Sequence, residues 1–153
     1  MTQFLVVSFK SRGYHIFTWL LASTIFISCR HENVDIQISK YASGNIEFLK
    51  KYENKKLHGE SVWFYPDGTL EAKVSYKNGT EDGHAYYFYR SGALKSHRYW
   101  KDGHMEGFLV DYWDGHYGIL QATLYYNQNG ELIYKKTFDS TGKFISEEGH
   151  KPQ

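Results

Sequence analysis

The stretch from residue 70 to residue 77 alternates strictly between apolar and polar side chains and reads Leu-Glu-Ala-Lys-Val-Ser-Tyr-Lys. A period of two places one set of side chains on each face of an extended chain, which is typical of a β-strand with one buried face. No helical stripe, with its period of 3.6, fits the same residues. Residues 70–77 are therefore predicted to form a strand.

The same pattern recurs along the chain at a fixed period. Gly59, Gly83 and Gly107 stand 24 residues apart, and each opens a run rich in aromatic residues. A second glycine turn and a second run follow each of them, and the first two units close at Asn78-Gly79 and Asp102-Gly103. These residue pairs tolerate the positive φ angles that tight hairpin turns require. Each unit is therefore predicted to be a β-hairpin.

Consecutive hairpins joined by short turns predict an all-β fold, an elongated single-layer antiparallel β-meander built from tandem hairpin repeats of 24 residues. Tyr41 and Gly44 stand 24 residues before Tyr65 and Gly68, so a degenerate first repeat should cap one end. The third unit carries extra residues at 114–118, which are expected to form a loop or bulge. We expect the repeat domain to cover residues 35–146, with a closing hairpin at 131–146 and a C-terminal tail at 147–153.

Together these residues resemble a known repeat family. A glycine, aromatic residues three to six positions later, an Asx-Gly or Ser-Gly turn followed by leucine, another aromatic and a final Asx-Gly are similar to the MORN-type repeat, specifically its bacterial variant class. The resemblance spans roughly residues 35–146. It implies a role in interaction rather than catalysis, with membrane-proximal proteins or lipids as partners. Bacterial relatives are often labelled as antitoxins of toxin–antitoxin pairs.

The N-terminus has the pattern of an export signal. Lys10 and Arg12 precede a short apolar run at residues 16–27, and Ser28-Cys29 follows it. The run is short for a membrane span and has the length of a signal-peptide core. A small residue before the only cysteine resembles the lipobox of bacterial lipoproteins, although Phe26 replaces the usual leucine. We expect a signal peptide at 1–28 and an acylated Cys29 with a tether at 29–34; an ordinary secretory signal, or a buried cysteine without a role, is the alternative.

Charge and candidate chemistry narrow the function. A net charge of +1 over 153 residues makes nucleic-acid binding unlikely to be the role. The histidines near the repeat glycines and strands match no metal-ligand spacing, so no metal or cofactor is expected; they are His58, His84, His97, His104 and His116. The acid pairs sit at turns, where they keep the sheet soluble and protect its edges; they are Glu81 with Asp82, Asp102 with Glu106, and Asp111 with Asp114. No enzyme is expected.

The strongest candidate site is a ladder of aromatic residues at equal spacing. Tyr41, Tyr65, Tyr89 and Trp113 recur 24 residues apart, and a shorter row formed by Trp63 and Tyr87 lies two residues earlier in the repeat. Stacked rings stabilise a sheet, which is a structural interpretation of both rows. A single-layer sheet, however, cannot cover both of its faces, so an uncovered row of Tyr and Trp would be a binding strip.

These patterns predict a non-catalytic binding or scaffold module of the bacterial cell envelope, anchored to a membrane, expected to be the outer one, by lipid on Cys29. An aromatic-lined sheet face would contact envelope proteins, lipid or glycan. An antitoxin-type protein that binds a partner toxin is the alternative, although a cytosolic antitoxin would need no export. An envelope hydrolase that uses the turn histidines is a third and less favoured class.

Overall fold

The computed structural model describes residues 5–8, 33–115 and 118–152, which form one open antiparallel sheet in meander order, as predicted. None of these residues forms a helix, and so no helix among them could cross a membrane. The strands are β1 (Leu5–Ser8), β2 (Val34–Lys40), β3 (Ile46–Glu53), β4 (Lys56–Leu57), β5 (Gly59–Phe64), β6 (Leu70–Lys77), β7 (Thr80–Phe88), β8 (Leu94–Lys101), β9 (His104–Met105), β10 (Gly107–Tyr112), β11 (Leu120–Tyr126), β12 (Leu132–Phe138) and β13 (Phe144–Gly149).

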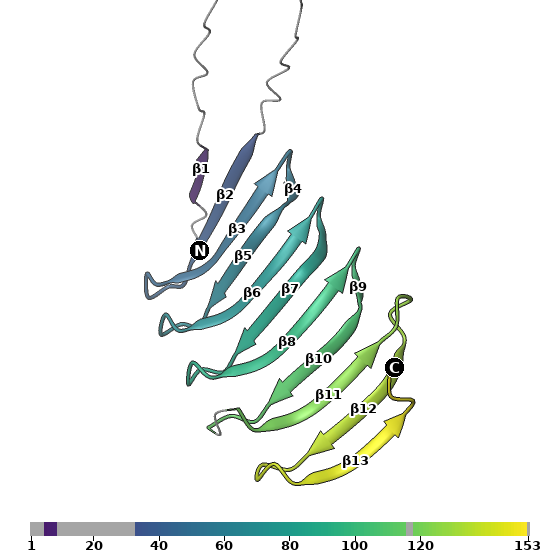
Figure 1. Cartoon of the computed structure of the whole chain (residues 1–153). Coiled ribbons are helices and arrows are strands. Elements are labelled where there is room, and N and C mark those ends of the chain that lie inside the picture. The colour runs from purple at the N-terminus through teal and green to yellow at the C-terminus, as the bar shows by residue number, and fades with distance from the viewer. Residues whose placement is uncertain (1–4, 9–32, 116–117, 153) are drawn as a thin grey trace, which may run out of the picture.

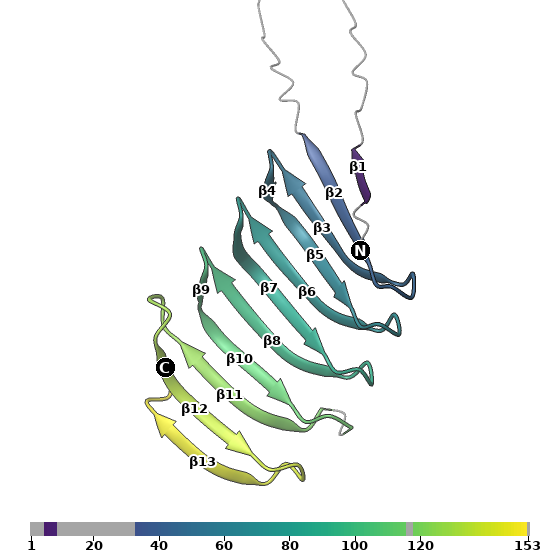
Figure 2. The same cartoon turned by 180° about the vertical axis from the view of Figure 1, so that it is seen from behind.

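The sheet is a single layer, as seen from both sides in Figures 1 and 2. The strands follow one another in chain order, except that the two-residue strands β4 and β9 fold back onto β3 and β8. No other described element covers either face of the sheet. The long strands curve toward one end of each hairpin (Figure 1). The predicted all-β, single-layer repeat architecture is therefore confirmed.

The tight turns at one end of the sheet have the predicted backbone. Asn78 and Gly79 have φ angles of 54° and 100°, and Asp102 and Gly103 have 47° and 84°. Two successive positive φ angles are the mark of the primed hairpin turn, whose twist matches that of the flanking strands. The repeat glycines use the same freedom for another purpose. Gly83, with φ of 107°, lies at an irregularity in the pairing of β7 with β6. This irregularity separates the short paired stretch beside the turn, which ends at Glu81, from the longer one that begins at Ala85.

Longer loops join the strands at the opposite end. In the first full repeat, the Tyr65 amide donates to the Thr69 carbonyl at 2.8 Å. In the third, the corresponding bond runs from the Trp113 amide to the Ile119 carbonyl at 3.0 Å, so that its loop is two residues longer. Tyr112 still pairs with Leu120 in the sheet. The pairing on both sides of the insertion therefore leaves the strand register beyond it intact; residues 116 and 117 lie outside the described residues.

The two ends of the described sheet bear on the predicted domain limits. β1 pairs with β2, with Leu5 opposite Ile38, although residues 5–8 belong to the expected signal peptide. The rest of that segment and Cys29 lie outside the described residues. At the other end, β13 continues to Gly149, beyond the expected limit of the repeat domain at residue 146. Glu147 and Glu148 pair there with Lys136 and Lys135, which places opposite charges across the last two strands.

The strand register assigns side chains to two faces. Alternate residues of a strand point to opposite sides of the sheet, and residues paired across neighbouring strands point to the same side. We name the two faces after one residue on each, the Trp63 face and the His97 face. The Trp63 row is Trp63, Ala72, Tyr87, Ser96, Asp111 and Ala122, and the His97 row is Lys73, Tyr86, His97, Val110 and Thr123.

Burial is concentrated on the Trp63 face, although no second layer packs on it. Ser61, Ala85 and Ser96 are 0–1% exposed, and Val74 is 3% exposed. Small side chains in a one-layer sheet can be covered only by larger neighbours on the same face, which a curved sheet brings together. Because most of these buried residues are small, the sheet depends on its backbone ladder and on partly buried rings rather than on a large core.

Candidate functional site

The predicted aromatic ladder ties each hairpin to the next one. The Tyr41 hydroxyl donates to the Phe64 carbonyl at 2.7 Å. Tyr65 and Tyr89 repeat this bond to the carbonyls of Phe88 and Tyr112, each at 2.8 Å. In the third unit the Trp113 indole N–H donates to the Phe138 carbonyl at 3.2 Å. The polar tips of all four side chains are thus engaged by the backbone of the following unit.

The environment of the ladder agrees with this bonding. Burial removes water from the phenols of Tyr41, Tyr65 and Tyr89 and raises the pKa of each, with nearby carboxylates adding to the effect. A neutral phenol is the form that can donate to a carbonyl. The geometry therefore gives the ladder a structural role. None of its four side chains is fully buried, so this role does not by itself exclude contact with a partner.

The shorter predicted row lies in the middle of the Trp63 face. Trp63 and Tyr87 flank Ala72, which is the register partner of both, and both rings are half-buried. Tyr76 lies beside Trp63 with 6.4 Å between ring centroids, and its hydroxyl is 3.4 Å from Glu81 Oε1. Burial, followed by the Glu81 carboxylate, raises the pKa of Tyr76 to about 12. These rings pack over the small residues between them and still present surface to solvent.

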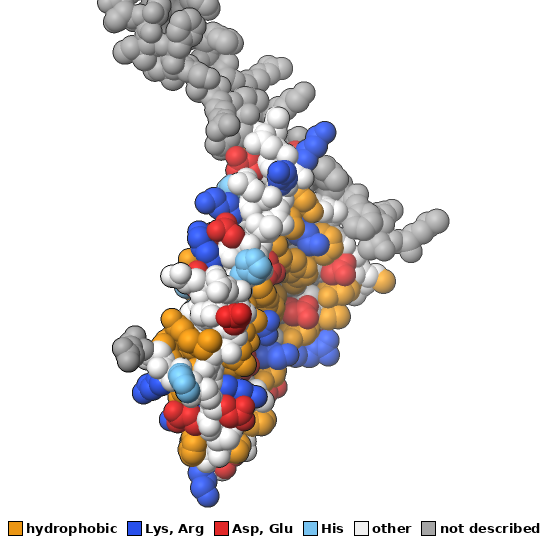
Figure 3. Space-filling view, turned by 90° about the vertical axis from the view of Figure 1, so that its right-hand side faces the viewer, with side chains coloured by type: hydrophobic (Ala, Val, Ile, Leu, Met, Phe, Trp, Pro, Cys, Tyr) orange, Lys and Arg blue, Asp and Glu red, His pale blue; other side chains and the backbone are white. Residues whose placement is uncertain are grey.

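Basic side chains lie over the rings of this face. Lys50 Nζ is 4.2 Å from the centroid of Phe48 and 5.5 Å from that of Trp63, and Arg98 Cζ is 4.6 Å from that of Tyr87. Such cation–π contacts hold the charges against the rings. In the space-filling view, hydrophobic side chains gather in a hollow along the sheet with basic and acidic ones among them (Figure 3). We call the five residues of these contacts the cation–aromatic strip: Phe48, Lys50, Trp63, Tyr87 and Arg98.

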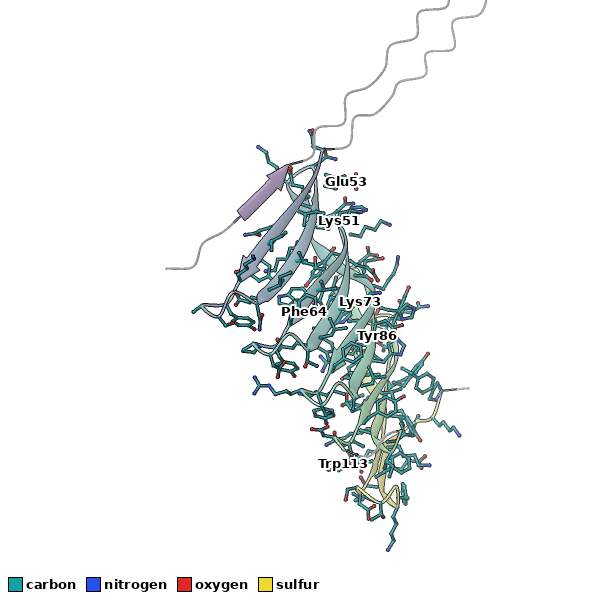
Figure 4. All side chains as sticks on the ribbon, turned by 90° about the vertical axis from the view of Figure 1, so that its left-hand side faces the viewer. Lys51, Glu53, Phe64, Lys73, Tyr86 and Trp113 are labelled. Atoms are coloured by element: carbon teal, nitrogen blue, oxygen red, sulfur yellow. The ribbon has the colours of Figure 1, made fainter. Side chains whose placement is uncertain are left out.

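A second aromatic cluster lies on the His97 face and joins two of the candidate histidines, His84 and His97, to tyrosines that the sequence analysis did not name. His84 pairs with Tyr99, and Tyr86 with His97, across β7 and β8. Nδ1 of His84 and Nε2 of His97 are 2.9 Å apart. The His97 ring stacks on Tyr86 at 4.6 Å with 4° between the planes. Burial, and then the neighbouring His84, lower the pKa of His97 and favour its neutral form. Figure 4 shows Tyr86 near Lys73, its partner on β6.

This face continues across the next strands with further rings. Phe108 on β10, which is 52% exposed, contacts Tyr125 on β11 at a centroid distance of 4.8 Å. The signal for this cluster was present in the sequence. His84 and Tyr86 are two residues apart on one strand, as are His97 and Tyr99 on the next, and the loop at residues 89–93 fixes their register. The placement of these histidines beside repeat glycines and strands indicated that some could converge, and the register shows that His84 and His97 do.

Two of the remaining candidates for chemistry, His58 and Asp82, have structural partners. His58 Nε2 lies 3.5 Å from Glu53 Oε2. The Asp82 carboxylate accepts from the Asp102 amide at 3.2 Å and from Lys101 Nζ at 3.4 Å, and these contacts lower the pKa of Asp82. Within the described residues, no group of three or more His, Cys, Asp or Glu side chains converges. His116 lies outside the described residues.

Comparison with known proteins bears on the repeat directly. The family model of the MORN repeat variant matches residues 57–78, and no catalytic family is evident. No curated protein matches the chain. The matched segment runs from the end of β4 through β5 and β6 to the tight turn at Asn78, which is one hairpin of the sheet. The chain therefore carries a MORN repeat variant at residues 57–78, within a β-sheet that repeats the same hairpin.

Proposed function

We propose that this chain is a non-catalytic binding or scaffold module that captures a partner protein on the cation–aromatic strip of its Trp63 face. The observation that carries the proposal is the position of Lys50 and Arg98 over the rings of Phe48, Trp63 and Tyr87 on a face that no other described element covers. Aromatic rings and arginine are the side chains that dominate protein interfaces. The MORN repeat is the family context for such a role.

The chemistry of the strip defines its partner. Each cation lies against a ring, so a partner that brings a carboxylate to Lys50 or Arg98 also meets the aromatic surface below it. We therefore expect a protein segment that carries acidic residues beside apolar ones. The ladder at Tyr41, Tyr65, Tyr89 and Trp113 would then hold successive hairpins in line, so that the strip keeps one geometry along the sheet. No observation on the described residues favours a toxin or a substrate as the bound molecule.

Paired variants on the two faces test this proposal. Trp63→Ser with Tyr87→Ser removes rings from the strip, and Tyr99→Ser with Tyr125→Ser removes two tyrosines from the His97 face as the matched control. Each protein is cross-linked in envelope extract, and the captured proteins are identified by mass spectrometry. A protein captured by wild type and by the control but lost with the first pair supports the strip. Circular dichroism melts establish that both variants fold, and equal capture by folded wild type and folded strip variant would contradict the proposal.

The anchor is a separate part of the proposal. A small residue before Cys29, just after an apolar run, is the feature that supports lipid attachment at the envelope. More than one acyl chain would hold the domain stably at a membrane, since each buried methylene contributes about 0.8 kcal/mol. Metabolic labelling with palmitate followed by fractionation tests this. Wild type should carry label in the membrane fraction, and Cys29→Ser should lose both. If neither protein is labelled, the anchor is absent whatever the sheet binds.

A further inference from the structure

We propose that His84 and His97 form a two-imidazole site for a divalent transition-metal ion of tetragonal preference, Cu²⁺ or Ni²⁺. The two side chains lie diagonally across β7 and β8 on the His97 face, with Nδ1 of His84 2.9 Å from Nε2 of His97. Both nitrogens are neutral-imidazole donors of the kind that these metals bind. The site is separate from the cation–aromatic strip, which lies on the other face.

The distance between the two nitrogens is compatible with a right-angled pair of ligands. Imidazole nitrogens lie about 2.0–2.1 Å from a bound metal ion. Two such nitrogens at a right angle are about 2.8–3.0 Å apart, and at the tetrahedral angle they are about 3.3–3.4 Å apart. The observed 2.9 Å is a hydrogen-bond distance that also matches the spacing at the right angle. Square-planar and tetragonal sites with nitrogen ligands are typical of Cu²⁺ and Ni²⁺, whereas protein-bound Zn²⁺ is usually tetrahedral.

Neighbouring rings hold the two imidazoles near this geometry. Tyr86 stacks in parallel on His97 with 4.6 Å between centroids. Tyr99 meets His84 edge-on at 5.1 Å and 62°. Ligands that are held by packing on rigid strands lose little freedom on binding, which favours affinity. Lys73, in the same register row as Tyr86 and His97, pairs with Glu60, whose Oε1 is 2.7 Å from its Nζ.

Binding of the metal ion changes neither its oxidation state nor the number of protons on the two imidazoles. In the neutral pair, an N–H of one ring donates to the lone pair of the other. A metal ion takes the lone pairs of both facing nitrogens, so that hydrogen bond breaks and its proton moves through water to the other nitrogen of the same ring. Two coordinate bonds form, and the net proton count of the pair is unchanged. Water, or a donor group from a bound partner, would complete the coordination.

The sequence analysis expected no metal because the histidine spacings match no ligand set. Thirteen residues separate His84 from His97, and only the register of β7 against β8 brings them together. Two protein ligands also fall below the three that a full protein site uses, as is consistent with the absence of larger groups among the described residues. The inferred site is accordingly an open one.

Calorimetric titration of the full chain with Cu²⁺, Ni²⁺ and Zn²⁺ tests the site. His84→Gln and His97→Gln each leave one imidazole, and His104→Gln is the matched control at an exposed histidine of a neighbouring turn. Losing the second arm of a chelate should weaken binding of Cu²⁺ and Ni²⁺ about tenfold or more in either site variant, with no change in the control. Ni²⁺ should bind more tightly than Zn²⁺. Electron paramagnetic resonance of the Cu²⁺ complex should show two equatorial imidazole nitrogens in wild type and one in either site variant.

The design keeps the proposal open to refutation. Each variant changes one histidine and keeps Cys29 and all the others, so a loss of affinity in His84→Gln and His97→Gln alone is due to the His84–His97 pair. Ni²⁺ is included because a thiol does not reduce it. Melting curves report on folding, and if His97→Gln does not fold, the exposed His84→Gln decides the outcome. Wild-type affinity for Cu²⁺ and Ni²⁺ in a folded His84→Gln variant would overturn the site. Tighter binding of Zn²⁺ than of Ni²⁺ would overturn its geometry.

Discussion

At the scale of single residues, the tight turns depend on backbone angles that few residues adopt. Gly79 has a φ of 100°, and its amide also donates to the Leu57 carbonyl at 2.8 Å, which joins the turn to the neighbouring hairpin. A β-branched residue at such an angle places its Cβ against the backbone. The turn therefore requires glycine for its angle rather than for space, since outside Gly79 and its two chain neighbours no described heavy atom comes closer than 4.0 Å to where a Cβ would stand.

Replacing Gly79 with valine tests that requirement. We expect the free energy of unfolding to fall by more than the ~1–2 kcal/mol typical of an L-residue in a left-handed conformation. Urea unfolding followed by circular dichroism measures the change. Lys77→Val, two residues earlier at the exposed end of β6, is the control for adding valine nearby. Equal unfolding midpoints for wild type and Gly79→Val would contradict the turn geometry.

Tyr76 gives the sheet a specific sensitivity to alkali. Its pKa is raised to about 12 by burial and by the Glu81 carboxylate, against about 10 in an unfolded chain. Above pH 10 the unfolded state releases this proton while the folded state keeps it, so the unfolded state binds fewer protons and stability falls as pH rises. The stabilising contribution is present below pH 10 and is lost between about pH 10 and pH 12.

Tyr76→Phe should remove this part of the alkaline loss. We expect the difference in unfolding free energy between pH 8 and pH 11 to be smaller in Tyr76→Phe than in wild type, as measured by urea unfolding at both values. Some loss should remain, because burial also raises the pKa of Tyr87 and of the ladder phenols. An identical pH dependence in both proteins would show that Tyr76 ionises normally in the folded sheet.

At the scale of the element, each hairpin is joined to the next by a hydrogen bond from a ladder side chain. Tyr65→Phe keeps the ring and removes the donor to the Phe88 carbonyl. The loss should lower the free energy of unfolding by about 0.5–1.5 kcal/mol. Tyr89→Phe should show a similar loss, because its hydroxyl makes the corresponding bond to Tyr112. Chemical denaturation measures both.

A tyrosine on the opposite face provides the control for the ladder. Tyr99→Phe removes a hydroxyl from the His97 face without touching the bonds between hairpins. If Tyr65→Phe and Tyr99→Phe change stability equally, the ladder bonds have no special part in joining the units, and the ladder residues return to being candidates for partner contact alone.

The hairpins themselves were predictable from sequence because their causes are local. Alternation at residues 70–77 specifies the strand and its two faces, and Asn78-Gly79 specifies the turn. The 24-residue period then extends one hairpin into a sheet. The two extra residues after Trp113 are an even number and so preserve the alternation of faces, and Tyr112 still pairs with Leu120 beyond them.

The candidate site was less predictable because its causes lie between strands. The equal spacing of Tyr65 and Tyr89 showed that their rings align, but the bond from each hydroxyl to the next unit depends on where the phenol tip ends. The approach of Lys50 and Arg98 to the rings, and of His84 to His97, likewise depends on side-chain direction across neighbouring strands. Sequence identifies such residues as neighbours only after the register is known.

At the scale of the whole molecule, the sheet is nearly one-dimensional. Each long strand pairs only with its neighbours in the meander, and no second layer of described residues links distant hairpins. In such an arrangement stability is approximately the sum of the units and the contacts between adjacent units. Terminal hairpins have one neighbour instead of two, so they should open before the central ones.

Hydrogen exchange can measure how the free energy of opening differs between terminal and central hairpins. Trp113 is the residue to change, because its indole N–H donates to the Phe138 carbonyl and joins the third unit to the closing hairpin. Trp113→Phe removes that donor and should lower the free energy of opening β12 and β13 by about 0.5–1.5 kcal/mol or more, since ring area is lost as well. Their amides should exchange about twofold to tenfold faster or beyond, while those of β6 and β7 keep their wild-type rates. Tyr41→Phe is the mirror variant, because its bond to Phe64 lies at the other end, and it should act on β2 and β3 alone. Equal acceleration in every strand would mean that the sheet opens as one cooperative unit, in which case local contacts between hairpins do not set local stability.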